Sequence, residues 1–136
     1  MMRFLLVGFG GALGSMARYG VGMAVARVAP GAAWPQPNWP WATMTVNVVG
    51  GLLMGLLVGW LSARGGAEGE TFRVFAAVGI LGGFTTFSAF SLEVVLMIER
   101  RQYAAAAAYV IASVVVSAVA LMIGLMIARR VFGAAA

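Results

Sequence analysis

The sequence predicts an all-α membrane protein with four transmembrane helices, the third of them broken near mid-membrane. Of its 136 residues, 62% are hydrophobic and only 10% are charged, which is less charge than a soluble domain of this size carries. Four apolar segments each exceed the roughly 20 residues that span a bilayer. The connectors between them are short, so we expect one domain, residues 1–136.

The four segments cover residues 4–28, 41–62, 72–98 and 103–131. The connector 29–40 contains all four prolines, which prevent helix continuation, and tryptophans, which favour the membrane interface. The connector 64–71 is rich in glycine and holds two glutamates, so it predicts an aqueous turn. Residues 99–102 predict a tight polar turn.

The centre of the third segment is the likeliest place for function. Residues 82–90 hold a Gly-Gly pair, two threonines, a serine and three phenylalanines. Lipid cannot satisfy backbone groups that a broken helix frees. Such a break is tolerated where it lines a cavity, packs against protein or holds an ion.

The composition excludes most enzyme chemistry. The chain has no cysteine, histidine or aspartate, and its ionisable residues are nine arginines, four glutamates and three tyrosines. This set lacks the usual groups for acid–base, metallohydrolase and triad catalysis. The net charge of +5 comes from arginines near segment ends, which indicates headgroup anchors and not a nucleic-acid surface.

The arginines give only a weak orientation signal. Four spans place five arginines on one side (Arg3, Arg64, Arg73, Arg129 and Arg130) and three on the other (Arg27, Arg100 and Arg101). A strongly oriented protein has a larger bias. The near balance fits insertion in both orientations, and it equally fits a modest bias that still orients the chain.

Three polar residues within the segments have two readings each. Arg18 forms an electropositive vestibule for an anion or extends to the interface. Asn47 is either inter-helix hydrogen-bonding glue or a pore ligand with two N–H donors. Glu93, the only acid well inside a segment, either extends to the interface or serves proton coupling near the midplane, for which it is poorly placed.

Two repeated spacings complete the candidates. Tyr109, Ser113 and Ser117 follow at i, i+4 and i+8, which puts three hydroxyls on one helix face unless the serines bond back to their own helix. Phe87 and Phe90 share a face, either as packing or with ring edges directed at an anion. Glycines at four-residue spacing (Gly10 and Gly14, and Gly51, Gly55 and Gly59) predict close helix packing.

Three motifs in order carry a family resemblance over essentially the whole chain. They are residues 10–19 (GGALGSMARY), 45–50 (TVNVVG) and 82–91 (GGFTTFSAFS), the last being the most specific. With these motifs the chain resembles the small bacterial fluoride channels of the CrcB or Fluc family. Ala89 departs from the threonine common there, and Ser15 replaces a usual alanine.

The resemblance implies an antiparallel, dual-topology homodimer with two fluoride pores at its interface. It also implies a structural, untransported Na⁺ held by the backbone carbonyls of Gly82 and Thr85. The implied pore residues are Asn47, Thr86, Phe87, Ser88, Phe90, Tyr109, Ser113 and Ser117, with Arg18 and Glu93 near the vestibules.

The implied function is passive export of cytoplasmic fluoride across the bacterial inner membrane, which reduces its toxicity. Two other readings remain open from the residues alone. One is a small dual-topology multidrug exporter coupled to protons, and the other is a non-transporting subunit of a membrane complex.

Overall fold

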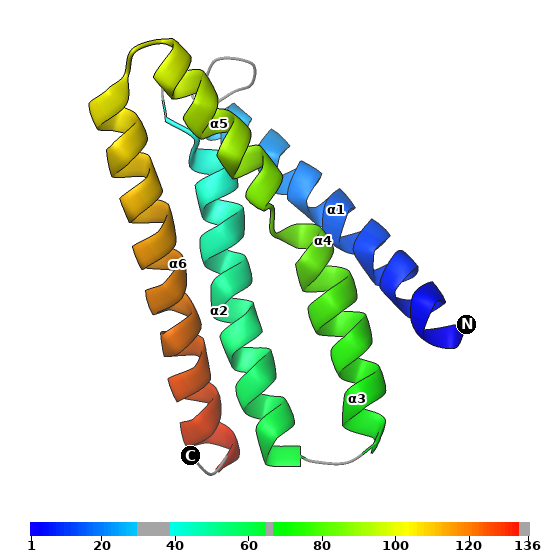
Figure 1. The fold of residues 1–136 in the computed structure, drawn as a ribbon. Helices are drawn as coiled ribbons and strands as arrows, with labels where there is room; N and C mark the ends of the chain where they lie inside the picture. The colour runs from blue at the N-terminus through cyan, green and yellow to red at the C-terminus, as the bar shows by residue number, and fades with distance from the viewer. Residues whose placement is uncertain (30–38, 65–66, 134–136) are drawn as a thin grey trace.

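The computed structural model describes residues 1–29, 39–64 and 67–133 and is entirely helical there, apart from short turns (Figure 1). Its elements in chain order are α1 (Met2–Val28), α2 (Trp41–Arg64), α3 (Ala67–Arg73), the π-helix η2 (Val74–Leu81), α4 (Gly82–Phe84), α5 (Phe87–Glu99) and α6 (Tyr103–Phe132). Most of the connector 29–40, with its prolines, lies outside the described residues.

Within the described residues, four helical stretches are long and apolar enough to cross a membrane. They are Met2–Val28, Trp41–Arg64, Gly69–Glu99 and Tyr103–Phe132. The prediction of an all-α protein with four spanning helices is therefore confirmed, and the chain is a multi-pass membrane protein. Large apolar side chains are exposed along all four stretches, as surfaces in contact with lipid or another subunit require.

One predicted connector is partly wrong. The stretch 67–71 was expected to be an aqueous turn, but it forms the beginning of α3. Glu70 and Arg73 lie three residues apart on this helix and form a bidentate ion pair with N–O distances of 2.9 Å. Charge pairs at this spacing support helix formation, and the two glycines at 65–66 lie outside the described residues.

The helices α2 and α6 run side by side in the same direction, from the top to the bottom of Figure 1. Glycines of α2 face the α6 backbone: a Cβ added at Gly51 would lie 2.8 Å from the Ser117 carbonyl oxygen, and one at Gly59 would collide with Ala128. Gly124 of α6 faces the α2 backbone in the same way. The glycine spacing therefore packs two backbones together, as predicted.

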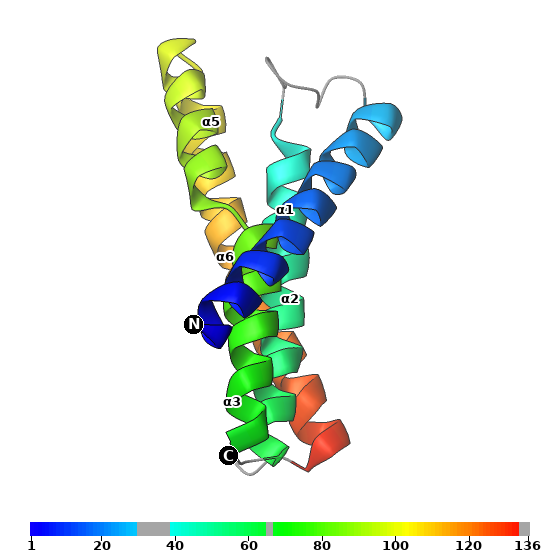
Figure 2. The same cartoon turned by 90° about the vertical axis from the view of Figure 1, so that its right-hand side faces the viewer.

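The helix α1 crosses the first half of the third span at a steep angle (Figure 2). Gly10 faces the backbone of η2 near Phe75 and Gly79, and Gly14 faces Ile80 and the backbone of α4. Through these glycines, α1 packs closely against η2 and α4, the segment that leads into the break. Above it, α5 diverges from α1 (Figure 2).

The third span is interrupted later than its glycines suggest. Gly82 and Gly83 are helical, and the interruption is two residues long, Thr85 and Thr86, between α4 and α5. The eight residues before Gly82 form a π-helix, an unpredicted element that often occurs near functional sites. The predicted mid-membrane break thus exists, with its position moved to the two threonines.

Candidate functional site

The break has an extended backbone. Thr85 has φ −75° and ψ 158°, and Thr86 has φ −150° and ψ 121°. The last α-helical bond before the break joins the Thr85 amide to the Leu81 carbonyl over 2.9 Å. The Thr85 hydroxyl donates to the same carbonyl, also at 2.9 Å. Both donors of Thr85 therefore close the end of the first half-helix.

Asn47 of α2 forms two hydrogen bonds with Thr86, the second residue of the break. Its Nδ2 donates to the Thr86 carbonyl oxygen at 3.1 Å, and its Oδ1 accepts from the Thr86 amide at 2.9 Å. The side-chain amide thus pairs with the backbone of an extended residue, as a neighbouring strand would. Of the two sequence readings, inter-helix glue describes these contacts, and one Nδ2 hydrogen remains for another acceptor.

The Thr86 side chain begins the second half-helix. Its Oγ1 accepts a hydrogen bond from the Ala89 amide at 3.2 Å, the standard N-cap arrangement, and lies 3.3 Å from the Ser88 hydroxyl. Thr86 is buried, whereas Ser88 is exposed. Thr86 therefore contributes its backbone to Asn47 and its hydroxyl to α5.

The hydrogen bonds of the Thr86 and Ala89 amides decide which donors the carbonyls of Gly82 and Thr85 lose. In an unbroken α-helix the Thr86 amide would bond to the Gly82 carbonyl, and the Ala89 amide to the Thr85 carbonyl. Here the two amides donate to Asn47 and to Thr86 Oγ1 instead. Both carbonyl oxygens therefore lack their usual helical donors, and hard cations such as Na⁺ take oxygen ligands.

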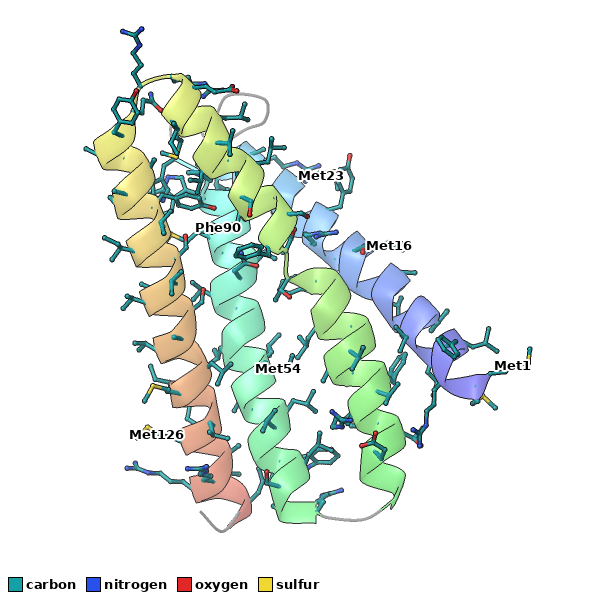
Figure 3. All side chains as sticks on the ribbon, in the orientation of Figure 1. Met1, Met16, Met23, Met54, Phe90 and Met126 are labelled. Carbon is teal, nitrogen blue, oxygen red and sulfur yellow. The ribbon has the colours of Figure 1, made fainter. Side chains whose placement is uncertain are left out.

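A groove of about 260 Å³ opens beside the break. Helices α2, α5 and α6 and the break itself contribute its lining, which is Asn47, Thr85, Thr86, Phe87, Phe90, Ser113, Val114 and Ser117. Figure 3 labels Phe90, where α5 passes in front of α2. The structure therefore brings six of the eight predicted pore residues to one groove.

The two groove serines have unused hydroxyls. Among the described residues, the buried side-chain atoms without a hydrogen-bond partner are Trp39 Nε1, Ser113 Oγ and Ser117 Oγ. The alternative in which these serines bond back to their own helix is therefore not what the structure has. A buried polar group without a partner is costly, so two in one groove indicate a site for a polar guest.

Three aromatic rings continue from the groove towards the start of α6. The ring centroids of Phe87 and Phe90 are 5.6 Å apart, and those of Phe90 and Tyr109 are 5.3 Å apart. Phe87 is 78% exposed in the single chain, whereas Tyr109 is fully buried. Like the other exposed apolar side chains of the spanning helices, Phe87 is placed to contact lipid or another subunit.

Tyr109 lies outside the groove because its hydroxyl is engaged with Glu93. It donates to Glu93 Oε2 at 2.7 Å, while Thr43 of α2 donates to Oε1 at 2.6 Å. This carboxylate therefore connects three helices near one end of the groove. Sequence reasoning did not single out Thr43, and its position four residues before Asn47, on the same face of α2, was the available signal.

Two further predicted residues do not line the groove. Arg18 is half-buried on α1 and does not line it. Ser88 lies beside Thr86 but is exposed and is not part of the lining either. Ser15, one of the departures from the family pattern, directs its hydroxyl to the Gly83 carbonyl at 3.4 Å, next to the proposed ion ligand Gly82.

Comparison with known proteins gives the family. The model of the CrcB-like protein family, also described as Camphor Resistance (CrcB), matches residues 5–125. The chain belongs to the CrcB family. It is 56% identical to the Fluoride-specific ion channel FluC of Caulobacter sp. (strain K31), over 97% of this chain and 98% of the relative. The FluC of Phenylobacterium zucineum is 54% identical over 97% and 99%, and that of Hyphomonas neptunium is 47% identical over the same shares. These names describe an ion channel and not an enzyme, in agreement with the sequence analysis.

Proposed function

We propose that this protein is a passive, fluoride-selective channel that exports cytoplasmic fluoride across the bacterial inner membrane. The observation that carries the proposal is the groove beside the break, with two buried hydroxyls that have no partner. Relatives that cover nearly the full chain are named fluoride-specific ion channels. No covalent step or energy source is required, because fluoride moves down its electrochemical gradient.

We propose that two chains pair, in opposite orientations, through the face that carries the break. Gly82, Phe87 and Ser88 are exposed on the single chain. Lipid would leave the polar backbone of the break without partners, so a second copy of the same surface is the fitting cover. The weak arginine asymmetry supports inverted pairing. Each groove then becomes one of two pores at the interface.

A structural Na⁺ at this interface fits the residues present. The carbonyl oxygens of Gly82 and Thr85 are those whose helical donors are bonded elsewhere. Two copies of each would give four oxygen ligands around a twofold axis, and sodium is a hard cation. When bound, this ion supplies a fixed positive charge that lowers the electrostatic cost of an anion near the midplane.

Fluoride is small and strongly hydrated, so a pore must replace its water with several weak contacts. The hydroxyls of Ser113 and Ser117 can donate, because neither has an acceptor in the described structure. Asn47 keeps one N–H, and the phenyl rings of Phe87 and Phe90 have positively polarised edges. Contacts of this kind bind the ion without trapping it.

Fluoride efflux from vesicles tests the proposal. Purified protein is reconstituted into vesicles loaded with potassium fluoride, and a fluoride electrode records release after a potassium ionophore is added. Rapid release without a pH gradient supports a passive channel. Release that requires a pH gradient supports the proton-coupled exporter, and release no faster than from protein-free vesicles supports the assembly subunit; either result refutes the proposal.

Replacing the phenylalanines tests the role of the groove. Phe87→Ile and Phe90→Ile keep apolar bulk but remove the ring edges, so flux should fall at least tenfold while the protein stays folded. Phe9→Ile is the matched control, because Phe9 is 65% exposed on α1 and remote from the groove. Flux equal to the control in both variants would remove the rings from the mechanism.

A further inference from the structure

One buried donor of the described structure is used by neither the fold nor the groove. Trp39, two residues before α2, has its indole Nε1 buried and without a hydrogen-bond partner. Indole nitrogen can only donate. The other two buried side-chain atoms without a partner, Ser113 Oγ and Ser117 Oγ, both belong to the groove. A third such group near the same site calls for a common explanation.

Trp39 lies just beyond the end of the groove. The hydroxyl series of α6 rises from Ser117 through Ser113 to Tyr109, towards the end of the bundle where α2 and α6 both begin (Figure 1). Trp39 packs against Tyr109 at that end, edge to face, with ring centroids 5.6 Å apart and planes at 81°. It also packs against the buried cluster of Met97, Ala106 and Tyr109.

An ion that leaves the groove towards the start of α6 passes hydroxyl donors that already have an acceptor. The hydroxyls of Tyr109 and Thr43 both donate to the Glu93 carboxylate. A strongly hydrated anion needs a donor at each step of its path. Among the described residues near this end, the Trp39 N–H is the buried donor that has no acceptor.

We propose that the Trp39 indole N–H is a fluoride contact at this end of the pathway, outside the Tyr109–Glu93–Thr43 cluster. Here it replaces one water of the ion as fluoride passes between the groove and the aqueous phase. The inference rests on the proposed fluoride conduction and extends it to a residue that the sequence marked only as a membrane-interface tryptophan.

Replacing the indole with a ring that has no donor tests the contact. Trp39→Phe keeps an aromatic ring against Tyr109 but has no donor, so fluoride efflux should fall by about tenfold, the factor expected for one hydrogen bond to a charged group. Trp41→Phe is the matched control: Trp41 stacks near Trp39, with centroids 5.9 Å apart, but is 51% exposed. Its flux should equal that of the unmodified protein.

A direct readout separates a fluoride contact from a packing role. In ¹⁵N-labelled protein in detergent, the four indole N–H resonances are recorded, and the one missing from Trp39→Phe is assigned to Trp39. Titration with sodium fluoride should shift this resonance, while equal concentrations of sodium chloride should not. The resonances of Trp41 and Trp60 serve as internal controls.

The outcomes are distinct. If the unmodified protein conducts but Trp39→Phe conducts equally well, the inference fails and the channel proposal stands. If the flux of Trp39→Phe falls but fluoride does not shift the Trp39 resonance, the inference again fails. The indole then acts by packing, or its N–H donates only to the Tyr109 ring. If the unmodified protein releases no fluoride, the channel proposal itself fails.

Discussion

Lipid offers no hydrogen-bond partners to backbone N–H and C=O groups. The α2–α6 pair and the α4–α5 break meet this requirement in opposite ways. In the pair, both segments are continuous α-helices, and glycines let the two helices approach closely. At the break, side chains from elsewhere take over the backbone bonds: Asn47 binds the Thr86 peptide groups, and Thr86 Oγ1 binds the Ala89 amide. The first region depends on missing side chains, and the second depends on particular ones.

The comparison teaches where sequence change is tolerated. A pair held by close approach is sensitive to added volume but indifferent to polarity. A break held by hydrogen bonds is sensitive to the loss of a single polar atom, because lipid offers no substitute. Variants that add volume to the first region and remove polar atoms from the second should therefore separate folding from conduction.

The largest effect is expected from Asn47→Leu. It removes both partners of the Thr86 peptide groups, and each buried group left without a partner costs about 1–3 kcal/mol. Unfolding in detergent should occur at a clearly lower denaturant concentration, and fluoride flux should fall to background. Thr45→Val, an exposed change on the same helix, is the control. Normal flux in Asn47→Leu would show that the break does not need the two hydrogen bonds from Asn47.

Gly55→Ala should come next. The added Cβ would collide with the Leu121 carbonyl and lie 2.8 Å from the Leu125 amide nitrogen, so α2 and α6 must separate. Overpacking of this kind costs about 1–3 kcal/mol of unfolding free energy. Flux per folded molecule should stay near normal, because Gly55 is not part of the groove. Gly8→Ala, with open space around the new Cβ, should be neutral; equal stability of the two variants would contradict the close packing.

Thr86→Val should have a smaller effect on stability, about 1 kcal/mol, the usual value of an N-cap. Its backbone bonds to Asn47 remain, but the Ala89 amide loses its acceptor. We expect a modest fall in melting temperature and a partial loss of flux, both restored by Thr86→Ser. Failure of the serine to restore them would assign the effect to the shape of the side chain and not to the cap.

The smallest effect is expected from Ser15→Ala. The Ser15 hydroxyl is 3.4 Å from the Gly83 carbonyl, which is a long hydrogen bond. Stability should change by less than about 0.5 kcal/mol, and flux should be unchanged. A loss of flux would mean that this contact with α1 helps to position the proposed Na⁺ ligands of α4.

The spans and the glycine contacts could be predicted because their signals are local. Hydropathy over about 20 residues identifies a spanning helix, and four-residue spacing places Gly51, Gly55 and Gly59 on one face. The π-helix could not be predicted in the same way. Its eight residues, VFAAVGIL, are all apolar or glycine, so no polar residue marks whether the turn is 3.6 residues or wider.

The site was predictable only as a set of residues, not as a set of contacts. The sequence indicated that the Asn47 amide needs a partner, because a polar group in a membrane helix seeks one. It did not indicate that Tyr109 bonds to Glu93, since that depends on how α5 and α6 are rotated against each other. Trp39 was marked only as an interface tryptophan, because whether its N–H finds a partner depends on how the helices pack around it.

The two hydrogen bonds between Asn47 and Thr86 have a consequence for motion. A single bond acts as a pivot, whereas two bonds to one residue resist rotation as well as separation. We therefore expect the angle between α4 and α5 to change little. The Thr86 amide should exchange with deuterium as slowly as a helical amide despite lying outside every helix. If the proposed fluoride pathway runs beside this joint, we expect it to have no gate at this point.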